Sequence, residues 1–215
     1  MFSLILCLLT AIGFGIIALL VVKRQIAPFD NTIISFVQGF ESPVWTQVMK
    51  FFTLLGSTPF VFICSLITLF LLYKIFKHRT ELIVFITAMA GSIILNQVLK
   101  HLFHRARPVI HRLIEERGYS FPSGHSMMSV TFYGILAVLL WRHIPNRTGR
   151  NLLVLVAALL VVAVGTSRIY LGVHYPSDVL GGYLVSGFWL SVVIFFYQKL
   201  QASKKVKLPQ RRDAK

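Results

Sequence analysis

Long apolar runs alternate with short charged segments along the whole chain. Six runs carry little or no charge, and most reach the roughly 20 residues that a helix needs to cross the hydrocarbon core of a bilayer. They lie at Phe2–Val22, Phe51–Tyr73, Leu82–Leu99, Ser126–Trp141, Asn151–Ser167 and Val179–Gln198. The pattern predicts an all-α polytopic membrane protein with six transmembrane helices. The first run lacks a basic start and a small-residue cleavage site, so we expect a retained span.

Between the first two runs, apolar residues recur at helical spacing instead of continuously. They are Ile33, Val37, Phe40, Val44 and Val48. This spacing is expected of an amphipathic helix in the membrane interface, and equally of a helix packed against neighbouring spans. We predict one six-span domain at 1–198 and a basic cytoplasmic tail at 199–215.

Composition agrees with the bilayer as solvent. The chain is 56% hydrophobic and only 13% charged, with a mean hydropathy of +0.74, which is too apolar for an ordinary soluble domain. The net charge of +15 alone fits nucleic acid or anionic lipid. Because the basic residues fall between apolar runs, anionic phospholipids are the expected partners and nucleic acid is not. Nothing in the sequence indicates an oligomeric state.

The basic loops predict orientation, because Lys and Arg gather on the cytoplasmic side of short loops. Three clusters share one side of a six-span layout: Lys74, Lys77 and Arg79; Arg142, Arg147 and Arg150; and the tail from Lys199 to Lys215. We therefore expect a plasma-membrane protein with both termini in the cytoplasm. The loops at 23–50, 100–118 and 168–178 then face outside.

Charged residues at the outer ends of spans are costly to desolvate and are candidates for function. Lys100, Arg107 and Pro108 form the pattern KxxxxxxRP at the end of the third span. Two cations held close together call for an anion, although snorkelling to the interface also explains them and accounts well for Arg105 and Arg112.

The tetrapeptide PSGH stands where the fourth span begins. Ser123 can cap that helix, and the outward-facing N–H groups of a helix N-terminus bind phosphate. Gly124 allows a ligand close to the backbone. His125 can give a proton to a departing oxygen, since an unperturbed histidine titrates near neutrality. A simple capping turn beside an interfacial histidine is the alternative.

A third pattern, SRxxxxxHxxxD, joins the fifth and sixth spans. Ser167 and Arg168 end one span, while His174 and Asp178 open the next at a separation that lets the carboxylate reach the imidazole. Such a pair fixes the histidine tautomer and leaves the other nitrogen lone pair free to attack phosphorus. A histidine paired with an acid and preceded by an arginine indicates a site.

Together, these three patterns resemble the signature of the type-2 phosphatidic acid phosphatase family, whose small bacterial branches act on phosphatidylglycerol phosphate or undecaprenyl pyrophosphate. The resemblance implies that His174 attacks in line to form a phosphohistidine, oriented by Asp178, and that His125 protonates the leaving group. It also implies a phosphate cradle made by the cations Lys100, Arg107 and Arg168 and by Ser123 and Gly124.

We expect no metal and no cofactor. Asp178 is committed to His174, and we place Glu115 and Glu116 with the basic residues Arg112 and Arg117, so no carboxylate cluster remains for magnesium. The remaining histidines are interpreted as interfacial, with a supporting role left open for His101 and His104 near Lys100.

Three other functions compete with a lipid phosphatase. A transporter fits six spans with buried charge, but here the charges gather at one face and not at the midplane. A vanadate-dependent haloperoxidase resembles the family at its phosphate site, yet those relatives are soluble. A phosphotransferase differs only in the acceptor, which sequence does not reveal. As substrates we expect undecaprenyl pyrophosphate and phosphatidylglycerol phosphate equally, ahead of phosphatidic acid, entering from the bilayer.

Overall fold

The computed structural model describes residues 2–75, 79–109 and 111–207, and these residues form helices and loops without strands. The helices are α1 (Phe2–Val22), α2 (Ala27–Gln38), α3 (Pro43–Leu55), α4 (Thr58–Phe70), the π-helical turn η1 (Leu71–Ile75), α5 (Arg79–Phe103), α6 (Gly124–Trp141), α7 (Arg147–Tyr170) and α8 (Pro176–Lys207). The predicted all-α fold is confirmed. Lys77 of the first basic cluster and residues 208–215 of the tail lie outside the described residues.

Five helices in the described part of the chain are long and apolar enough to cross a membrane, and the count rises to six if the bent pair Pro43–Leu55 and Thr58–Lys74 is one span. The apolar run Phe51–Tyr73 predicts a single helix, whereas the two segments meet at 45° and the first of them begins at Pro43. Ser57 begins α4 by accepting a hydrogen bond from the Phe60 N–H, and Pro59 in the first turn has no N–H to continue α3.

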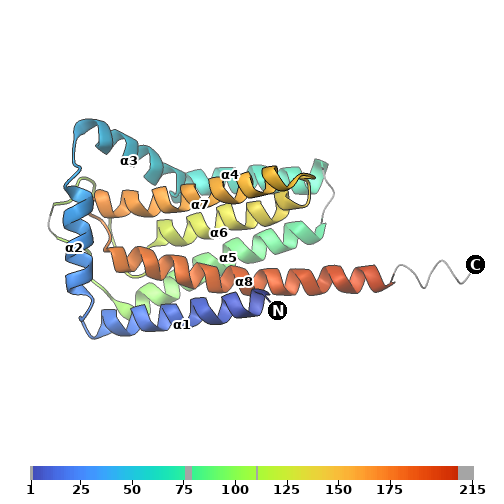
Figure 1. The fold of residues 1–215 in the computed structure, drawn as a ribbon, viewed down its shortest axis with the longest axis horizontal. Helices are drawn as coiled ribbons and strands as arrows, with labels where there is room; N and C mark the ends of the chain where they lie inside the picture. The colour runs from blue at the N-terminus through green and yellow to red at the C-terminus, as the bar shows by residue number, and fades with distance from the viewer. Residues whose placement is uncertain (1, 76–78, 110, 208–215) are drawn as a thin grey trace, which may run out of the picture.

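The segment expected to form the amphipathic helix is two helices. Gly39 ends α2, and Ser42 caps α3 with Pro43 at its first position, so the apolar positions divide between them. Figure 1 shows α2 lying across one end of the bundle, nearly perpendicular to the spans. Its Phe36 is exposed while Val37 packs beside Tyr170, so α2 has both an outward face and a face against the bundle.

The bundle buries a core between its helices and turns a broad apolar surface outward. Val61, Phe85 and Ile135 are fully or almost fully buried where α4, α5 and α6 meet. Gly91 lets α8 approach α5 closely, because a Cβ there would come within 2.1 Å of the Trp189 ring. Large apolar side chains along α1, such as Leu8, are exposed, as expected of a surface that faces lipid.

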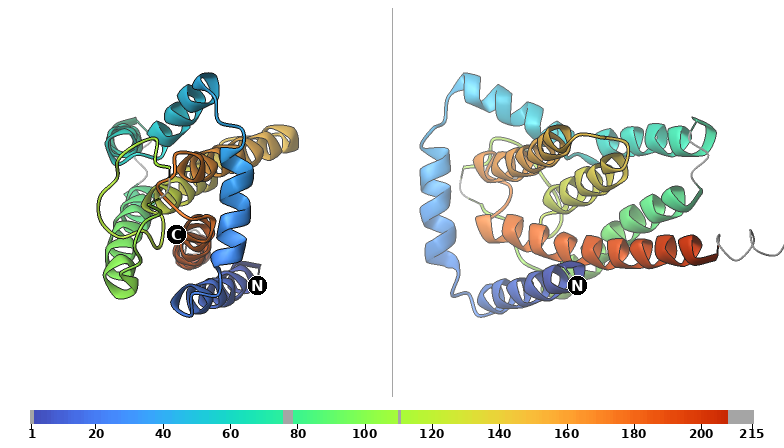
Figure 2. Two further views of the ribbon diagram at one scale, coloured as in Figure 1. Left: turned by 90° about the vertical axis from the view of Figure 1, so that its left-hand side faces the viewer. Right: turned by 45° about the vertical axis from the view of Figure 1, so that its right-hand side comes forward.

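The antiparallel arrangement collects particular helix ends at the α2 end of the molecule (Figure 2). The ends of α5 and α7 and the starts of α6 and α8 meet there, joined by loop 104–123 and by the turn at 171–175. These are the segments that carry the three sequence patterns. The fold thus brings motifs that are far apart in sequence to one face.

Candidate active site

A cavity of about 230 Å³ at this end of the bundle is lined by five of the eight predicted site residues. These are Lys100, Arg107, Gly124, His125 and His174. Asp178 and Arg168 lie behind the wall of the cavity, in contact with lining residues. Ser123 also belongs to this region but is turned away from the cavity, as described below.

His174 sits between an acid and a cation. Its Nδ1 lies 3.4 Å from Asp178 Oδ2, and its Nε2 accepts a hydrogen bond of 3.0 Å from Arg107 Nη1. Since guanidinium only donates, the lone pair must be on Nε2 and the proton on Nδ1. Burial lowers the pKa of His174 to about 4, against the opposing effect of Asp178. The imidazole is therefore neutral at neutral pH, with its lone pair on the cavity side.

The Asp178 carboxylate is fixed from several directions. The Ser120 hydroxyl donates to Oδ2 at 2.5 Å, and the Tyr175 N–H donates to the same oxygen at 2.8 Å. Arg105 holds Oδ1 at 2.7 Å. The interpretation of Arg105 as a snorkelling residue is wrong, because its guanidinium is largely buried and ion-paired. Ser120 also went unrecognised, since it belongs to no pattern.

The Arg107 guanidinium is held by backbone carbonyls. Its nitrogens donate to the carbonyl oxygens of Gly118, Arg117 and Val173 at 2.9–3.0 Å. Burial is the main cause of a lowered pKa for Arg107, which remains a cation because an arginine titrates so far above neutrality. Three of its five N–H groups are thus held by carbonyls, which leaves the one that bonds His174 Nε2 and one more to donate to an oxyanion.

Arg168 is buried, and one of its three guanidinium nitrogens has no hydrogen-bond partner in the described part of the chain. Its Nη1 donates to Thr53 Oγ1 at 2.5 Å and its Nη2 to the Glu116 carboxylate. Its Nε is buried with no hydrogen-bond partner among the described residues. A buried N–H without a partner costs stability, and this N–H is able to donate a hydrogen bond to an anion.

The position of Glu116 is a correction. We expected it beside Arg112 and Arg117, but its carboxylate bonds Arg168, and Glu116 lines the cavity. Burial alone would raise the pKa of Glu116, yet the pKa is lowered, because the neighbouring Arg168 favours the ionised form. An anionic group therefore already occupies part of the cationic site.

The PSGH turn begins α6 as the sequence predicts. The Ser123 hydroxyl accepts hydrogen bonds from the Ser126 N–H at 3.4 Å and from its hydroxyl at 3.0 Å. That engagement turns Ser123 Oγ toward the helix instead of the cavity. Gly124 and His125 do line the cavity. Asn96 of α5, which no motif marked, bonds the Pro122 carbonyl at 3.3 Å and supports this turn.

Two other features complete the site region. The ring centroids of His101 and His104 lie 5.9 and 4.5 Å from that of Tyr119, and neither histidine lines the cavity.

Within the described ranges, no three His, Cys, Asp or Glu side chains gather in a way that could hold a metal ion.

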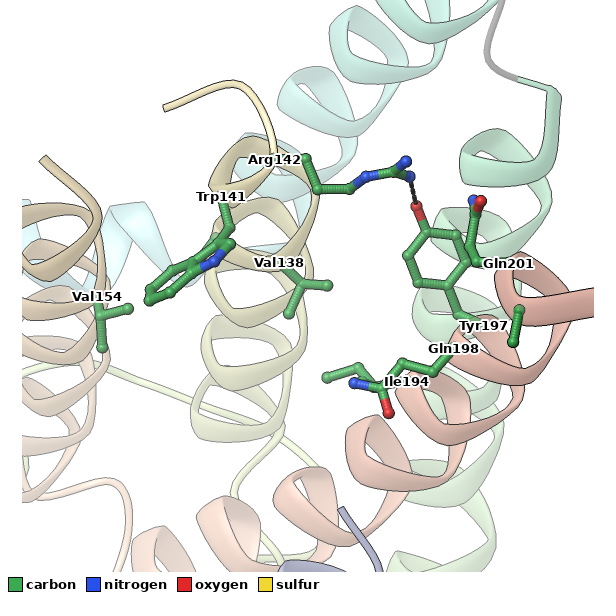
Figure 3. Close-up of a pocket in the computed structure, with 10 residues that line it drawn as sticks. Val138, Trp141, Arg142, Val154, Ile194, Tyr197, Gln198 and Gln201 are labelled. Carbon is green, nitrogen blue, oxygen red and sulfur yellow. Dashed lines mark hydrogen bonds between the residues drawn. The ribbon is translucent and has the colours of Figure 1, made fainter. Parts of the chain in front are cut away.

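A separate cavity of about 560 Å³ lies between α6, α7 and α8 (Figure 3). Its wall is mostly apolar, with Val138, Trp141 and Val154 among its residues, and Arg142 at the rim donates to the Tyr197 hydroxyl. Arg142 is also paired with Glu81. None of the predicted catalytic residues lines this cavity.

Known proteins resemble this chain in sequence. Residues 81–202 match the PAP2 superfamily, and that segment contains every predicted site residue. Phosphatidylglycerophosphatase B of Bacillus subtilis (strain 168) is 34% identical over 190 residues, covering 86% of this chain and 89% of that protein. A putative undecaprenyl-diphosphatase of Escherichia coli (strain K12) is 32% identical over 152 residues, covering 63% of this chain and 70% of that protein.

A solved structure extends the similarity to the fold. The crystal structure of a transmembrane PAP2-type phosphatidylglycerolphosphate phosphatase from Bacillus subtilis superposes with a TM-score of 0.79 at 30% identity. The match covers 90% of this chain and 96% of that one.

Proposed function

Since this chain belongs to the PAP2 superfamily and is a multi-pass membrane lipid phosphatase, we propose that it uses His174 to hydrolyse a phosphate ester or pyrophosphate on a lipid. One observation carries the proposal. The buried imidazole is neutral, has Asp178 behind its Nδ1, and turns its Nε2 lone pair toward a small cavity lined by cations.

The proposed reaction has two steps at this nitrogen. His174 Nε2 attacks phosphorus in line, the phosphorus–oxygen bond to the lipid breaks, and His125 gives the departing oxygen its proton. Before this attack, the Arg107 N–H that bonds Nε2 in the structure turns to a phosphate oxygen, because the Nε2 lone pair must be free to attack. In the second step, His125 takes a proton from water, whose oxygen attacks the phosphohistidine and releases inorganic phosphate and neutral His174.

The surrounding charges support this chemistry. Lys100 and Arg107 line the cavity, Arg168 lies behind its wall against Glu116, and Gly124 brings the start of α6 to the lining. Fixed cations of this kind match the charge on the equatorial oxygens of a transferring phosphoryl group. We propose that they replace the metal ions that other phosphoryl-transfer enzymes use, so that hydrolysis proceeds with chelator present.

The substrate is proposed from the site's location and the relatives. Phosphatidylglycerol phosphate and undecaprenyl pyrophosphate are the first candidates, in keeping with the names of two relatives, and phosphatidic acid follows. The cavity lies at the end of the spans, where a lipid head group is displayed, and we propose entry from the bilayer. The positions of the basic loops favour an external site, with both termini cytoplasmic.

The test is phosphate release in detergent from these three lipids and from a water-soluble phosphate ester, with chelator present. The wild type is compared with His174→Ala and with the control His143→Ala, whose ring nitrogen bonds the Leu139 carbonyl at the other end of α6. We expect release by the wild type and the control alone. Activity surviving in His174→Ala, or lost with chelator, would contradict the mechanism, and product analysis separates hydrolysis from transfer to another acceptor.

A further inference from the structure

A chain of buried polar contacts links α2 to the proposed nucleophile. Asp30, on α2, is only 1% exposed. Its Oδ1 accepts a hydrogen bond of 2.9 Å from the Ser177 N–H, and its Oδ2 accepts one of 2.7 Å from the Ser177 hydroxyl. Asp30 thereby anchors the helix that lies across the bundle to the first turn of α8.

Arg105 continues the chain to Asp178. Its Nη2 lies 2.7 Å from Asp30 Oδ2, and its Nη1 lies 2.7 Å from Asp178 Oδ1 and from Ser177 Oγ. The Tyr175 ring covers the guanidinium at 4.1 Å from its centroid. One arginine thus bridges two buried carboxylates, and its planar fork makes both contacts at once.

This arrangement of buried charges does little to stabilise the fold. Two buried carboxylates share one guanidinium, and buried ion pairs seldom stabilise a protein more than apolar packing would. Neither Asp30 nor Arg105 lines the cavity that holds Lys100 and His174, so neither is placed to bind the transferring phosphate. A role in holding Asp178 explains both the cost and the location.

We propose that Arg105 and Asp30 are positioning residues for the phosphoryl transfer, an inference that rests on the proposed function of His174. Arg105 holds Asp178 Oδ1, so that Oδ2 stays directed at the Nδ1 proton of His174. Asp30 in turn holds Arg105. When Nε2 attacks phosphorus, the ring gains positive charge, and a carboxylate held in place stabilises that charge without reorganising.

Three variants test the link through steady-state kinetics on a lipid phosphate. Arg105→Gln removes the bridge but leaves two buried carboxylates unpaired, and this threatens folding. The double variant Asp30→Asn with Arg105→Gln loses one charge of each sign and keeps the side-chain sizes similar. Arg112→Gln is the matched control, because Arg112 lies in the same loop and bonds the Pro108 carbonyl.

The double variant should lose kcat by roughly 10- to 100-fold, as expected when a reacting group is misplaced. Its KM should stay within about threefold, because no phosphate contact is removed. The control should keep wild-type kinetics. Unchanged kcat in a folded double variant would overturn the proposal, and so would a loss confined to KM, which would mean that Arg105 binds substrate directly.

Nuclear magnetic resonance of ¹⁵N-histidine protein in detergent tests the same link without turnover. His174 signals are identified by their loss in His174→Ala. We expect protonated Nδ1 and unprotonated Nε2 in the wild type and the control, and a mixture of tautomers in the double variant. An unaltered tautomer would overturn the positioning role. If the wild type shows the Nδ1 proton but hydrolyses no lipid, the proposed function is contradicted. The tautomer of His174 in the double variant would still test whether Arg105 and Asp30 position Asp178.

Discussion

The carboxylate of Glu116 bonds the guanidinium of Arg168, at the edge of the cavity where the phosphate is proposed to bind. Glu116 comes from loop 104–123 and Arg168 from the last turn of α7. The pair places a negative charge where the substrate's own negative charge would enter. Phosphate and Glu116 should therefore compete for Arg168.

Glu116→Gln should bind inorganic phosphate more tightly than the wild type. Removing the competing charge should lower the inhibition constant by about 2- to 10-fold, the usual scale for one charge near a partly exposed site. Inhibition of lipid hydrolysis by added phosphate measures it. The control is Glu115→Gln, which changes an exposed neighbour. Equal or weaker inhibition of Glu116→Gln would show that Glu116 does not compete with phosphate.

Asp178→Asn should lower kcat by about 10²- to 10⁴-fold in a folded protein. An amide that donates toward Nδ1 favours the tautomer with the proton on Nε2, which removes the attacking lone pair. Ser120→Ala should cost less, because Tyr175 N–H and Arg105 still hold the carboxylate. Single-turnover formation of the phosphoenzyme measures both. A kcat for Asp178→Asn within a few-fold of the wild type would show that the carboxylate does not set the tautomer.

The rate should persist well below neutral pH. Protonated His174 has no lone pair on Nε2, and burial brings its pKa to about 4. Activity that depends on this group is complete above its folded pKa and is lost as the pH falls through about 4, rather than through the ordinary value of 6.5. The acid side of a kcat/KM profile reports this value, with thermal stability followed at each pH. A fall centred near 6.5 would mean that another group, or a solvated His174, controls the reaction.

Gly91→Ala should destabilise the bundle without touching the site. A Cβ there would meet the Trp189 ring, whose Nε1 is held by the Ala88 carbonyl at 3.0 Å, so the ring has little room to move. Overpacking of this kind costs about 1–3 kcal/mol. Gly15→Ala on α1 is the control, since a Cβ there meets nothing within 4 Å. Thermal unfolding in detergent compares the two, and equal melting temperatures would contradict close packing of α5 on α8.

Much of the fold could be predicted from local patterns alone. Apolar runs of sufficient length become helices in a bilayer because each backbone N–H and C=O must be satisfied within the segment. The helix start at Ser123 is equally local, since the capping hydroxyl bonds its own first turn. The break between α3 and α4 was missed, although Ser57 and Pro59 mark it, because hydropathy runs through it without interruption.

The candidate site also has features that local sequence predicts and features that depend on tertiary packing. The sequence by itself determined which residues to consider, since charges at the ends of apolar runs are costly and His174 reaches Asp178 within one helical turn. Only the tertiary structure decided that Arg105 joins Asp30 to Asp178 and that Glu116 bonds Arg168. Those partners come from separate segments. Which buried charges meet depends on how the helix ends pack, and no local periodicity encodes that.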